Sequence, residues 1–164
     1  MVDATLGNGH DAYFLASAIA PHGHLYGFDI SPQAIASSRQ RLLPFADRVT
    51  LVQQCHSELL RVVAPHHLRQ VAAVVFNLGY LPGGDKALIT RVATTLRALN
   101  QSLQLLAANG VISIIAYPGH PGGDEECDAV HAWCRQLPRP YNFLHQQPLT
   151  RDRPSPQWFF ISRR

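Results

Sequence analysis

Long apolar runs are missing from this chain of 164 residues. No stretch of about 18 consecutive apolar residues occurs, so no segment is suited to cross a bilayer as a helix, and we expect no membrane partner. The first residues carry neither a basic leader nor a cleavable apolar stretch, and we therefore expect no secretion. We predict a single cytoplasmic domain over residues 1–164, because this length supports one hydrophobic core but not two.

Cysteines and metal-ligand patterns are also scarce. Three cysteines occur, at Cys55, Cys127 and Cys134. An odd number of cysteines without zinc-ligand spacing predicts reduced thiols rather than a disulfide framework. Neither an H-x-x-x-H nor a C-x-x-C pattern is present, and the adjacent His66 and His67 lack candidate partners, so we predict no metal site.

Charged residues make up only 15% of the chain, with a net charge of +3, and they are unevenly distributed. Residues 135–164 contain six arginines against one acid, Asp152, whereas the preceding 134 residues contain eight Lys and Arg against ten Asp and Glu. A basic end of this kind predicts a surface that faces phosphates. A solvated arginine-rich surface without a partner is an equally open alternative.

Apolar segments and turn signals alternate at the spacing of βα units, which predicts an α/β fold with a mostly parallel sheet of seven strands. After the first strand, the predicted strands cover residues 24–30, 48–54, 71–79, 111–119, 141–149 and 156–164. One predicted helix follows the turn at 7–9, and the other predicted helices cover residues 31–43, 57–64, 85–110 and 123–137. No helix separates the last two strands, so we expect an antiparallel C-terminal hairpin.

Two of these helices carry predicted end signals. Pro65 is expected to end the helix at 57–64, and Asn109-Gly110 is expected to end the helix at 85–110. The longer helix has an apolar face formed by Leu88, Val92, Leu96, Leu99, Leu103 and Leu106.

The first predicted strand is unusually short. Only Met1 and Val2 precede "DATLGNGHD" (3–11), whereas a central strand usually has about five residues. We therefore expect a truncated first strand and a chain that lacks an N-terminal segment present in its relatives.

The glycine turn in "LGNGHDA" (6–12) follows this strand and leads into a helix. Gly7 and Gly9 supply positive φ and let a ligand approach the backbone closely, at the end of the sheet where open α/β folds bind ligands. Asp29, at the end of the next strand, can accept hydrogen bonds from two ribose hydroxyls. The turn also satisfies G-x-G-x-x-G/A, so NAD binding is a rival interpretation.

Two acids beside the turn favour a cationic ligand over a dinucleotide. Asp11 in the first helical turn would repel a pyrophosphate, and Asp3 directly precedes the turn. S-adenosylmethionine (SAM) fits better, because it has a ribose, an ammonium and a sulfonium but no phosphate. Ordinary capping by the two acids is the alternative. His56, after the third strand, is expected near the adenine, with capping of the next helix through Ser57 as an equal alternative.

Two further loops follow predicted central strands. In "NLGYLPGGDK" (77–86), the carbonyl oxygen of Asn77 can accept from an amino group, the ring of Tyr80 can stack on a base, and Asp85 is expected to cap the next helix. In "YPGHPGGDEE" (117–126), His120 can orient an acceptor or accept a proton near neutral pH. The structural alternative for the first loop is a strand-to-helix turn with a buried tyrosine. The structural alternative for the second loop is a histidine that only faces solvent.

Together, "DATLGNGHD", "FNLGYLPGGDK" and "YPGHPGG" resemble the motifs of a small bacterial family long labelled rRNA methylases and now assigned as tRNA 5-aminomethyl-2-thiouridine methyltransferases. The resemblance covers nearly the whole chain. It implies a Rossmann-like class I methyltransferase fold with SAM as the cofactor. Carried over by motif, it implies cofactor contacts from Asp3, Gly7, Gly9, His10, Asp11, Asp29 and His56, and acceptor-side catalytic roles for Asn77, Tyr80 and His120.

The substrate implied by the resemblance is the aminomethyl group on the modified wobble uridine of tRNA. The anticodon stem-loop would be held by the arginine-rich C-terminal surface. A homodimer is left open as an alternative to a monomer. Methylation of an rRNA base or a small molecule is the alternative within the enzyme class. An NAD-linked oxidoreductase and a non-catalytic cofactor-binding module are the alternatives outside it.

Overall fold

The computed structural model describes residues 1–80, 83, 88–148 and 155–163. Within this part of the chain, seven strands form one sheet in the order β3-β2-β1-β4-β5-β7-β6. The strands are β1 (Val2–Asp3), β2 (Leu25–Asp29), β3 (Val49–Gln53), β4 (Val71–Leu78), β5 (Leu106–Ala116), β6 (Tyr141–Gln146) and β7 (Gln157–Arg163). The strands β1 to β5 pair in parallel, and β7 is antiparallel to both β5 and β6. The predicted α/β fold with an antiparallel C-terminal hairpin is confirmed.

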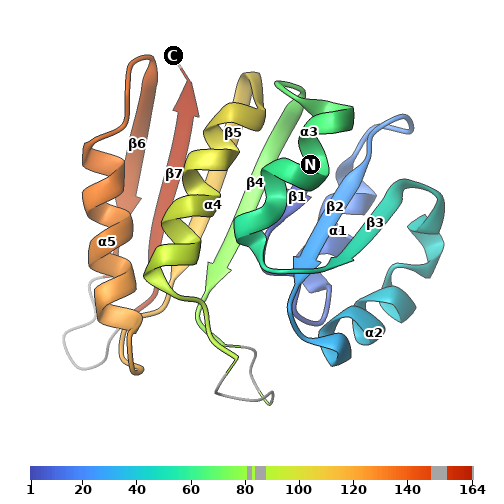
Figure 1. Ribbon diagram of the computed structural model, residues 1–164, viewed down its shortest axis with the longest axis horizontal. Coiled ribbons are helices and arrows are strands. Elements are labelled where there is room, and N and C mark those ends of the chain that lie inside the picture. Colours follow the sequence, from blue (N-terminus) through green and yellow to red (C-terminus); the bar gives the residue numbers. More distant parts are fainter. Residues whose placement is uncertain (81–82, 84–87, 149–154, 164) are drawn as a thin grey trace.

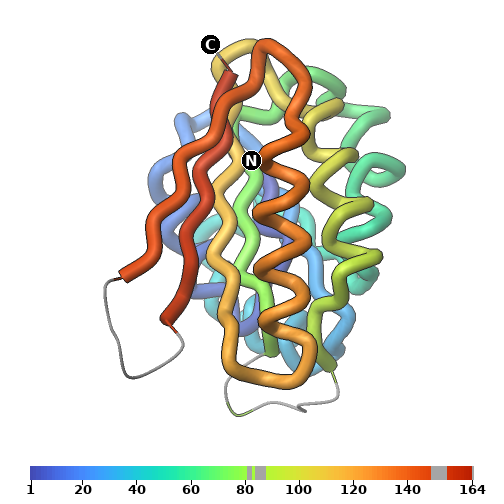
Figure 2. Tube along the Cα trace, turned by 90° about the vertical axis from the view of Figure 1, so that its left-hand side faces the viewer, coloured from blue at the N-terminus to red at the C-terminus, as the bar shows by residue number. Residues whose placement is uncertain are grey.

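Helices cover both faces of the sheet (Figure 1, Figure 2). One face is covered by α3 (Leu59–His67), α4 (Val92–Leu105) and α5 (Gly123–Arg135), and the other by α1 (His10–Ala18) and α2 (Pro32–Arg41). Short 3-10 helices span η1 (Leu43–Arg48) and η2 (His56–Glu58). The larger apolar cluster contains Phe28, Phe76 and Phe159, and the smaller one, beneath α1 and α2, contains Leu25 and Ile35.

No helix in the described ranges is long and apolar enough to span a bilayer.

Local signals explain several element boundaries. Ser31 caps α2, because its Oγ accepts a hydrogen bond from the Ala34 backbone N–H at 3.2 Å, and Pro32 occupies the first helical position as predicted. β1 is indeed short. Its two residues, Val2 and Asp3, are buried and pair with β2 on one side and β4 on the other. This short central strand places the glycine turn in the middle of the sheet.

Two predicted helix ends are wrong. α3 continues through Pro65 to His67, because a proline in the last turn removes few of the bonds that hold a helix. α4 begins at Val92 and ends at Leu105, so it is shorter than predicted. It ends there because Leu106 adopts an extended conformation (φ −60°, ψ 134°) and is the first residue of β5.

The predicted end signal of the long helix lies inside a strand instead. Asn109 and Gly110 belong to β5, where the register with β4 shifts next to Val71. A Cβ on Gly110 would lie 2.7 Å from the carbonyl oxygen of Val71, so glycine permits a close approach of the two strands. Leu88, predicted on the buried helical face, lies outside α4 and is 40% exposed. Asp85, the predicted cap, lies outside the described residues.

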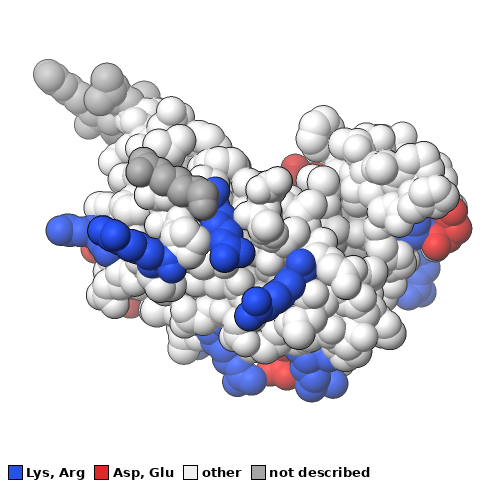
Figure 3. All heavy atoms as spheres, turned by 90° about the horizontal axis from the view of Figure 1, so that it is seen from above, with Lys and Arg blue, Asp and Glu red and all other residues white. Residues whose placement is uncertain are grey.

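The described arginines of the C-terminal region lie at the amino ends of the parallel strands. β7 runs antiparallel to β5, so its last residue, Arg163, lies there, and it pairs with Tyr141 at the start of β6. Arg135 ends α5, Arg139 precedes β6, and all three arginines are exposed. Figure 3 looks onto this end of the molecule and shows several Arg side chains on it.

Candidate active site

A pocket of about 1080 Å³ lies at the carboxyl ends of the parallel strands. It opens where β1 adjoins β4 and the strand order reverses, which is the usual ligand site of such sheets. Its volume is at the upper end of the range for small-molecule sites, large enough for a cofactor and part of an acceptor. The predicted site residues that line it are Gly7, His10, Asp11, Asp29, His56, Asn77, Tyr80 and His120. Asp3 and Gly9 lie behind this lining.

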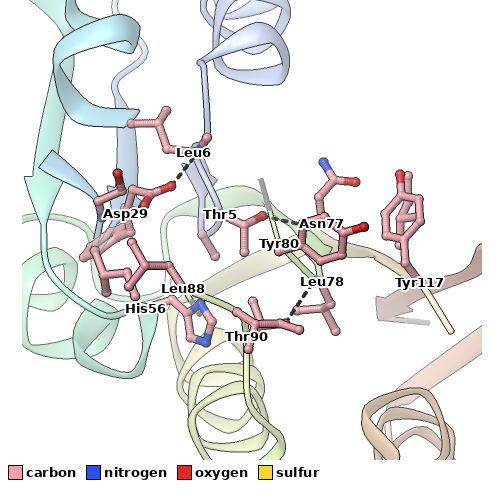
Figure 4. Close-up of a pocket in the computed structure, with 18 of the residues that line it drawn as sticks. Thr5, Leu6, Asp29, His56, Asn77, Leu78, Tyr80, Leu88, Thr90 and Tyr117 are labelled. Atoms are coloured by element: carbon pink, nitrogen blue, oxygen red, sulfur yellow. Dashed lines mark hydrogen bonds between the residues drawn. The ribbon is translucent and has the colours of Figure 1, made fainter. Parts of the chain in front are cut away.

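Asp29 holds the glycine turn in place. Gly7 and Gly9 have φ values of 51° and 75°, as predicted. The Oδ2 of Asp29 accepts from the Gly7 backbone N–H at 2.8 Å, and its Oδ1 accepts from the Ser31 N–H at 2.8 Å (Figure 4). The Oγ of Ser38 donates to the Gly7 carbonyl at 2.9 Å. A carboxylate has about four acceptor positions, so Asp29 keeps capacity for ribose hydroxyls.

The charge of the pocket is acidic. Among its described lining residues, Asp11 and Asp29 are acids and none is Lys or Arg. Asp3 is buried behind them, and burial, reinforced by the charges of Asp11 and Asp29, raises its pKa to about 7. Its Oδ1 accepts from the Thr5 N–H at 3.1 Å, whereas Oδ2 has no partner among the described residues. This charge balance suits a cationic ligand and disfavours a pyrophosphate.

Asp11 and Asn77 connect the glycine turn to the end of β4. The Nδ2 of Asn77 donates a hydrogen bond to the Oδ2 of Asp11. The Asn77 backbone N–H donates to Thr5 Oγ1 at 2.7 Å (Figure 4). Asp11 does not cap α1, whose N-cap is Gly9 without a side-chain bond. This bond turns the amide nitrogen of Asn77 toward Asp11, so the amide oxygen is the acceptor that the side chain can offer to a ligand.

Three rings lie around the pocket beyond Asn77. Tyr80 is 38% exposed, so it is not the buried tyrosine of the alternative interpretation, and its ring meets that of His120 edge-on with centroids 5.6 Å apart. His120 is half-buried rather than solvent-facing, and its Nε2 has no hydrogen-bond partner in the described part of the chain. Tyr117, exposed directly after β5, also lines the pocket. The sequence reasoning missed it, although its place at a strand end was a usable signal.

His56 lines the pocket on the side of β2 and β3. It is buried, and burial lowers its pKa, while a hydrogen bond to the Ala4 backbone and the charge of Asp29 oppose that shift. Its Nε2 is buried and has no hydrogen-bond partner among the described residues. The alternative of capping through Ser57 is wrong, since neither η2 nor α3 has a side-chain cap.

One exposed arginine contacts the pocket lining, and a second follows a lining residue in the sequence. The Nε of Arg41 donates to the carbonyl of Asn8, which lines the pocket, at 2.8 Å. Arg91 directly follows Thr90, another lining residue. Arg151 and Arg153, which the sequence placed in the predicted basic surface, lie outside the described residues.

Known proteins share the sequence pattern and the fold of this chain. Residues 25–162 match the model of the family described as "Putative rRNA methylase". The chain is 39% identical over 148 residues to the "tRNA (mnm(5)s(2)U34)-methyltransferase, chloroplastic" of Arabidopsis thaliana, a match that covers 84% of this chain and 53% of that protein. The chain therefore spans about half the length of this relative.

Two solved structures share the fold over 99% of this chain and 87% of each of their own. A "putative rRNA-methylase" from Clostridium thermocellum has a TM-score of 0.91 and 35% identity. A "putative methyltransferase" from Streptococcus mutans, in complex with S-adenosylhomocysteine (SAH), has a TM-score of 0.85 and 32% identity. These matches decide against the NAD-linked alternative. The protein belongs to the family described as putative rRNA methylases and has a Rossmann-like class I methyltransferase fold, for which SAM is the expected cofactor.

Proposed function

We propose that the protein methylates the aminomethyl group of a modified wobble uridine in tRNA. The observation that carries the proposal is the pairing of an amide oxygen and an exposed ring, Asn77 and Tyr80, beside the acidic glycine turn. An amine can donate to the first, and the base that bears it can stack on the second. The Arabidopsis relative is named as a tRNA methyltransferase for mnm(5)s(2)U34, which supports this acceptor.

SAM supplies a methyl group on a cationic sulfonium when it is bound, and the pocket residues fit it. In the proposal, Gly7 lets the backbone approach the cofactor and Asp29 accepts from its ribose hydroxyls. The carboxylate of Asp11 attracts its cationic groups, and the unpaired Nε2 of His56 meets its adenine.

The other predicted cofactor residues act less directly. Gly9 shapes the turn, because its φ of 75° places the chain for α1. Asp3 contributes charge from behind the lining, and His10 is an exposed residue at the rim.

The acceptor must lose a proton before it can react, because a primary alkyl amine is mostly protonated at pH 7. In the proposal, the amide oxygen of Asn77 accepts one N–H of the amine and fixes the direction of its lone pair. The departing proton goes to the unpaired Nε2 of His120 or to solvent, either directly or through the hydroxyl of Tyr80, which takes up one proton as it passes its own on to water. The ring of Tyr80 replaces the stacking that a wobble base loses when it leaves its neighbours.

We propose the anticodon stem-loop as the partner, but we assign its phosphate contacts to arginines other than those of the C-terminal region. The described C-terminal arginines lie at the opposite end of the sheet, and β4, with eight residues or about 26 Å, separates the two ends. RNA that enters the pocket meets Arg41 and Arg91 first, so we assign the nearby phosphate contacts to these two residues. A homodimer and a cytoplasmic location stay predictions from the sequence.

Two measurements test the proposal. Mass spectrometry of tRNA nucleosides from cells without the protein is expected to show loss of one methylated wobble uridine and accumulation of its aminomethyl precursor. In transfer of labelled methyl to such tRNA, Asn77→Ala and Tyr80→Ala are each expected to lower kcat at least about tenfold through misplacement of the amine. The matched control Asn109→Ala is exposed at the opposite end of the sheet and is expected to leave kcat unchanged.

Other outcomes contradict the proposal. Transfer to rRNA or to a small molecule, but not to tRNA, supports the alternative acceptors. Binding of SAM without transfer to any of these acceptors supports a non-catalytic module. Full activity of both variants means that Asn77 and Tyr80 do not place the acceptor.

A further inference from the structure

A buried carboxylate outside the pocket, Glu126 on α5, is bonded to the segment that carries Tyr80. Glu126 is only 2% exposed and does not line the pocket. Its Oε2 accepts from the Thr90 hydroxyl at 2.5 Å, and its Oε1 accepts from the Thr95 hydroxyl at 2.7 Å. One side chain therefore joins α5 to the first turn of α4 and to the segment that precedes it.

Thr90 is also hydrogen-bonded to the backbone of Gly79, directly after β4. Its Oγ1 accepts from the Gly79 backbone N–H at 2.8 Å, and its own N–H donates to the Gly79 carbonyl at 3.0 Å (Figure 4). Tyr80 then pairs with Ile89 in an isolated β-bridge. Because the Thr90 hydroxyl accepts from Gly79, its hydrogen is directed to Glu126. A continuous chain of bonds thus runs from the carboxylate to the backbone beside Tyr80.

The bonding pattern requires a carboxylate at position 126. Both threonines donate their hydroxyl hydrogens to Glu126, one to each oxygen. A glutamine retains one acceptor oxygen and presents an NH2 group, itself a donor, to the other threonine. At Thr90, the NH2 group forces the hydroxyl to rotate and weakens the bond from Gly79; at Thr95, it removes the bond that holds Glu126 to α4, so Glu126 no longer anchors both segments.

The first turn of α5 also supports the second acceptor loop. The Gly123 N–H donates to the His120 carbonyl at 2.9 Å, and a Cβ on Gly123 would lie 2.7 Å from His120 Nε2. The Glu126 N–H donates to the Gly122 carbonyl at 3.0 Å within the same turn. The start of α5 therefore contacts both loops on the acceptor side of the pocket.

We infer that Glu126 is a positioning residue for methyl transfer, which sets the backbone of Gly79 and Tyr80 relative to His120. The inference rests on the proposed function for the identity of the acceptor. The cofactor turn is held separately, by Asp29. Loss of the carboxylate is therefore expected to misplace the acceptor and to leave cofactor binding intact.

The test compares Glu126→Gln with Glu125→Gln, which makes the same charge change at an exposed neighbour on the same helix. Glu126→Gln is expected to lower kcat for methyl transfer to tRNA at least about tenfold, while its Kd for SAM stays within about twofold of wild type. Glu125→Gln is expected to change neither. Equal kcat values for the two variants, or a SAM Kd that rises as much as kcat falls, would overturn the inference.

A double-variant cycle separates positioning from general weakening of the fold. In a Tyr80→Ala background, Glu126→Gln is expected to lower the residual kcat by less than about twofold, because its effect passes through the segment that carries Tyr80. A merely structural role of Glu126 lowers kcat by the same factor in both backgrounds, and that result contradicts positioning. Thr90→Val, which leaves the Glu126–Thr95 bond in place, is the second variant if Glu126→Gln does not fold, and it is expected to show the same kcat loss.

Amide hydrogen exchange tests the connection without any acceptor. In Glu126→Gln, or in Thr90→Val, exchange at the Gly79 amide is expected to accelerate at least about tenfold, whereas the Gly7 amide, bonded to Asp29, keeps its wild-type rate. An unchanged Gly79 rate overturns the inference whatever the RNA result. A wild-type protein that methylates no tRNA refutes the proposed function instead, and the exchange contrast still decides the role of Glu126.

Discussion

Replacement of Gly9 with alanine tests whether the shape of the glycine turn sets cofactor affinity. Gly9 has a φ of +75°, and a Cβ at this position would lie 2.7 Å from Ser38 Oγ and 3.0 Å from Ser38 Cβ. Ser38 is fully buried, and its hydroxyl donates to the Gly7 carbonyl at 2.9 Å. The serine therefore cannot move away from a new methyl group without loss of a bond that shapes the turn.

The structure also gives the magnitude and a control. A left-handed backbone costs an L-residue about 1–2 kcal/mol, and an overpacked methyl group costs about 1–3 kcal/mol more. We therefore expect Gly9→Ala to lower the free energy of unfolding by about 2–5 kcal/mol. Gly122 occupies the corresponding N-cap of α5 with a φ of +82°, but no described atom lies within 4 Å of its Cβ position. Gly122→Ala is expected to show only the backbone cost of about 1–2 kcal/mol.

Urea unfolding followed by circular dichroism measures the stability difference, and titration calorimetry measures SAM binding. We expect Gly9→Ala to be the less stable variant by about 1–3 kcal/mol, since the overlap with Ser38 is the term that differs. Its SAM affinity is expected to fall at least about tenfold, or about 1.4 kcal/mol, because Gly7 is displaced together with Ser38. Equal stability of the two variants, or wild-type SAM affinity in Gly9→Ala, would refute this account of the turn.

Two further predictions concern buried titratable groups. Burial raises the pKa of Asp3 from 3.8 to about 7, so the folded protein holds a proton between these values that the unfolded chain releases. The free energy of unfolding of wild type, relative to that of Asp3→Asn, is therefore expected to fall by roughly 3–4 kcal/mol as pH rises from 4 to 7. Urea unfolding of both proteins at several pH values measures this difference, and a difference that does not change with pH contradicts the prediction. Burial also raises the pKa of Cys127 to about 11 and of Cys134 to about 12, whereas Cys55 lines the pocket. With a disulfide reagent, we expect one fast-reacting thiol, that of Cys55, and we expect SAH to slow its reaction. Three fast-reacting thiols, or an unchanged rate in the presence of SAH, contradict this prediction.

The parts of the fold that the sequence predicted well depend on neighbouring residues. Ser31 and Pro32 mark the start of α2 because a cap and a proline act within one helical turn. The apolar run that contains Phe76 predicts a central strand because both faces of β4 are covered. Such signals are complete within a few positions of the chain, so they can be read without the tertiary structure.

The errors arise where distant pairing overrides a local pattern. The leucine period of α4 continues to Leu106, and nothing within the helix shows that it ends at Leu105. Leu106 leaves the helix because it pairs with Val71 of β4. Gly110 resembles a helix stop, but the carbonyl of Val71 is what requires glycine there. Both facts depend on a strand that precedes the helix, so the period of the leucines could not predict them.

The site also has features that local motifs predict and contacts between distant segments that they do not, and Asp11 belongs to both groups. Glycine turns and ribose acids are local motifs, whereas the hydroxyls of Thr5 and Thr90 act on backbone from remote segments, which no spacing predicts. The sequence suggested Asp11 as an electrostatic partner of the cofactor, and the structure also bonds it to Asn77 on the acceptor side. If the proposed roles hold, a substitution at Asp11 is expected to change cofactor binding and acceptor placement together. Under the proposed function, the two sides of the pocket can be tested separately at residues that support one side alone, such as Asp29 for the cofactor turn and Glu126 for the acceptor segment.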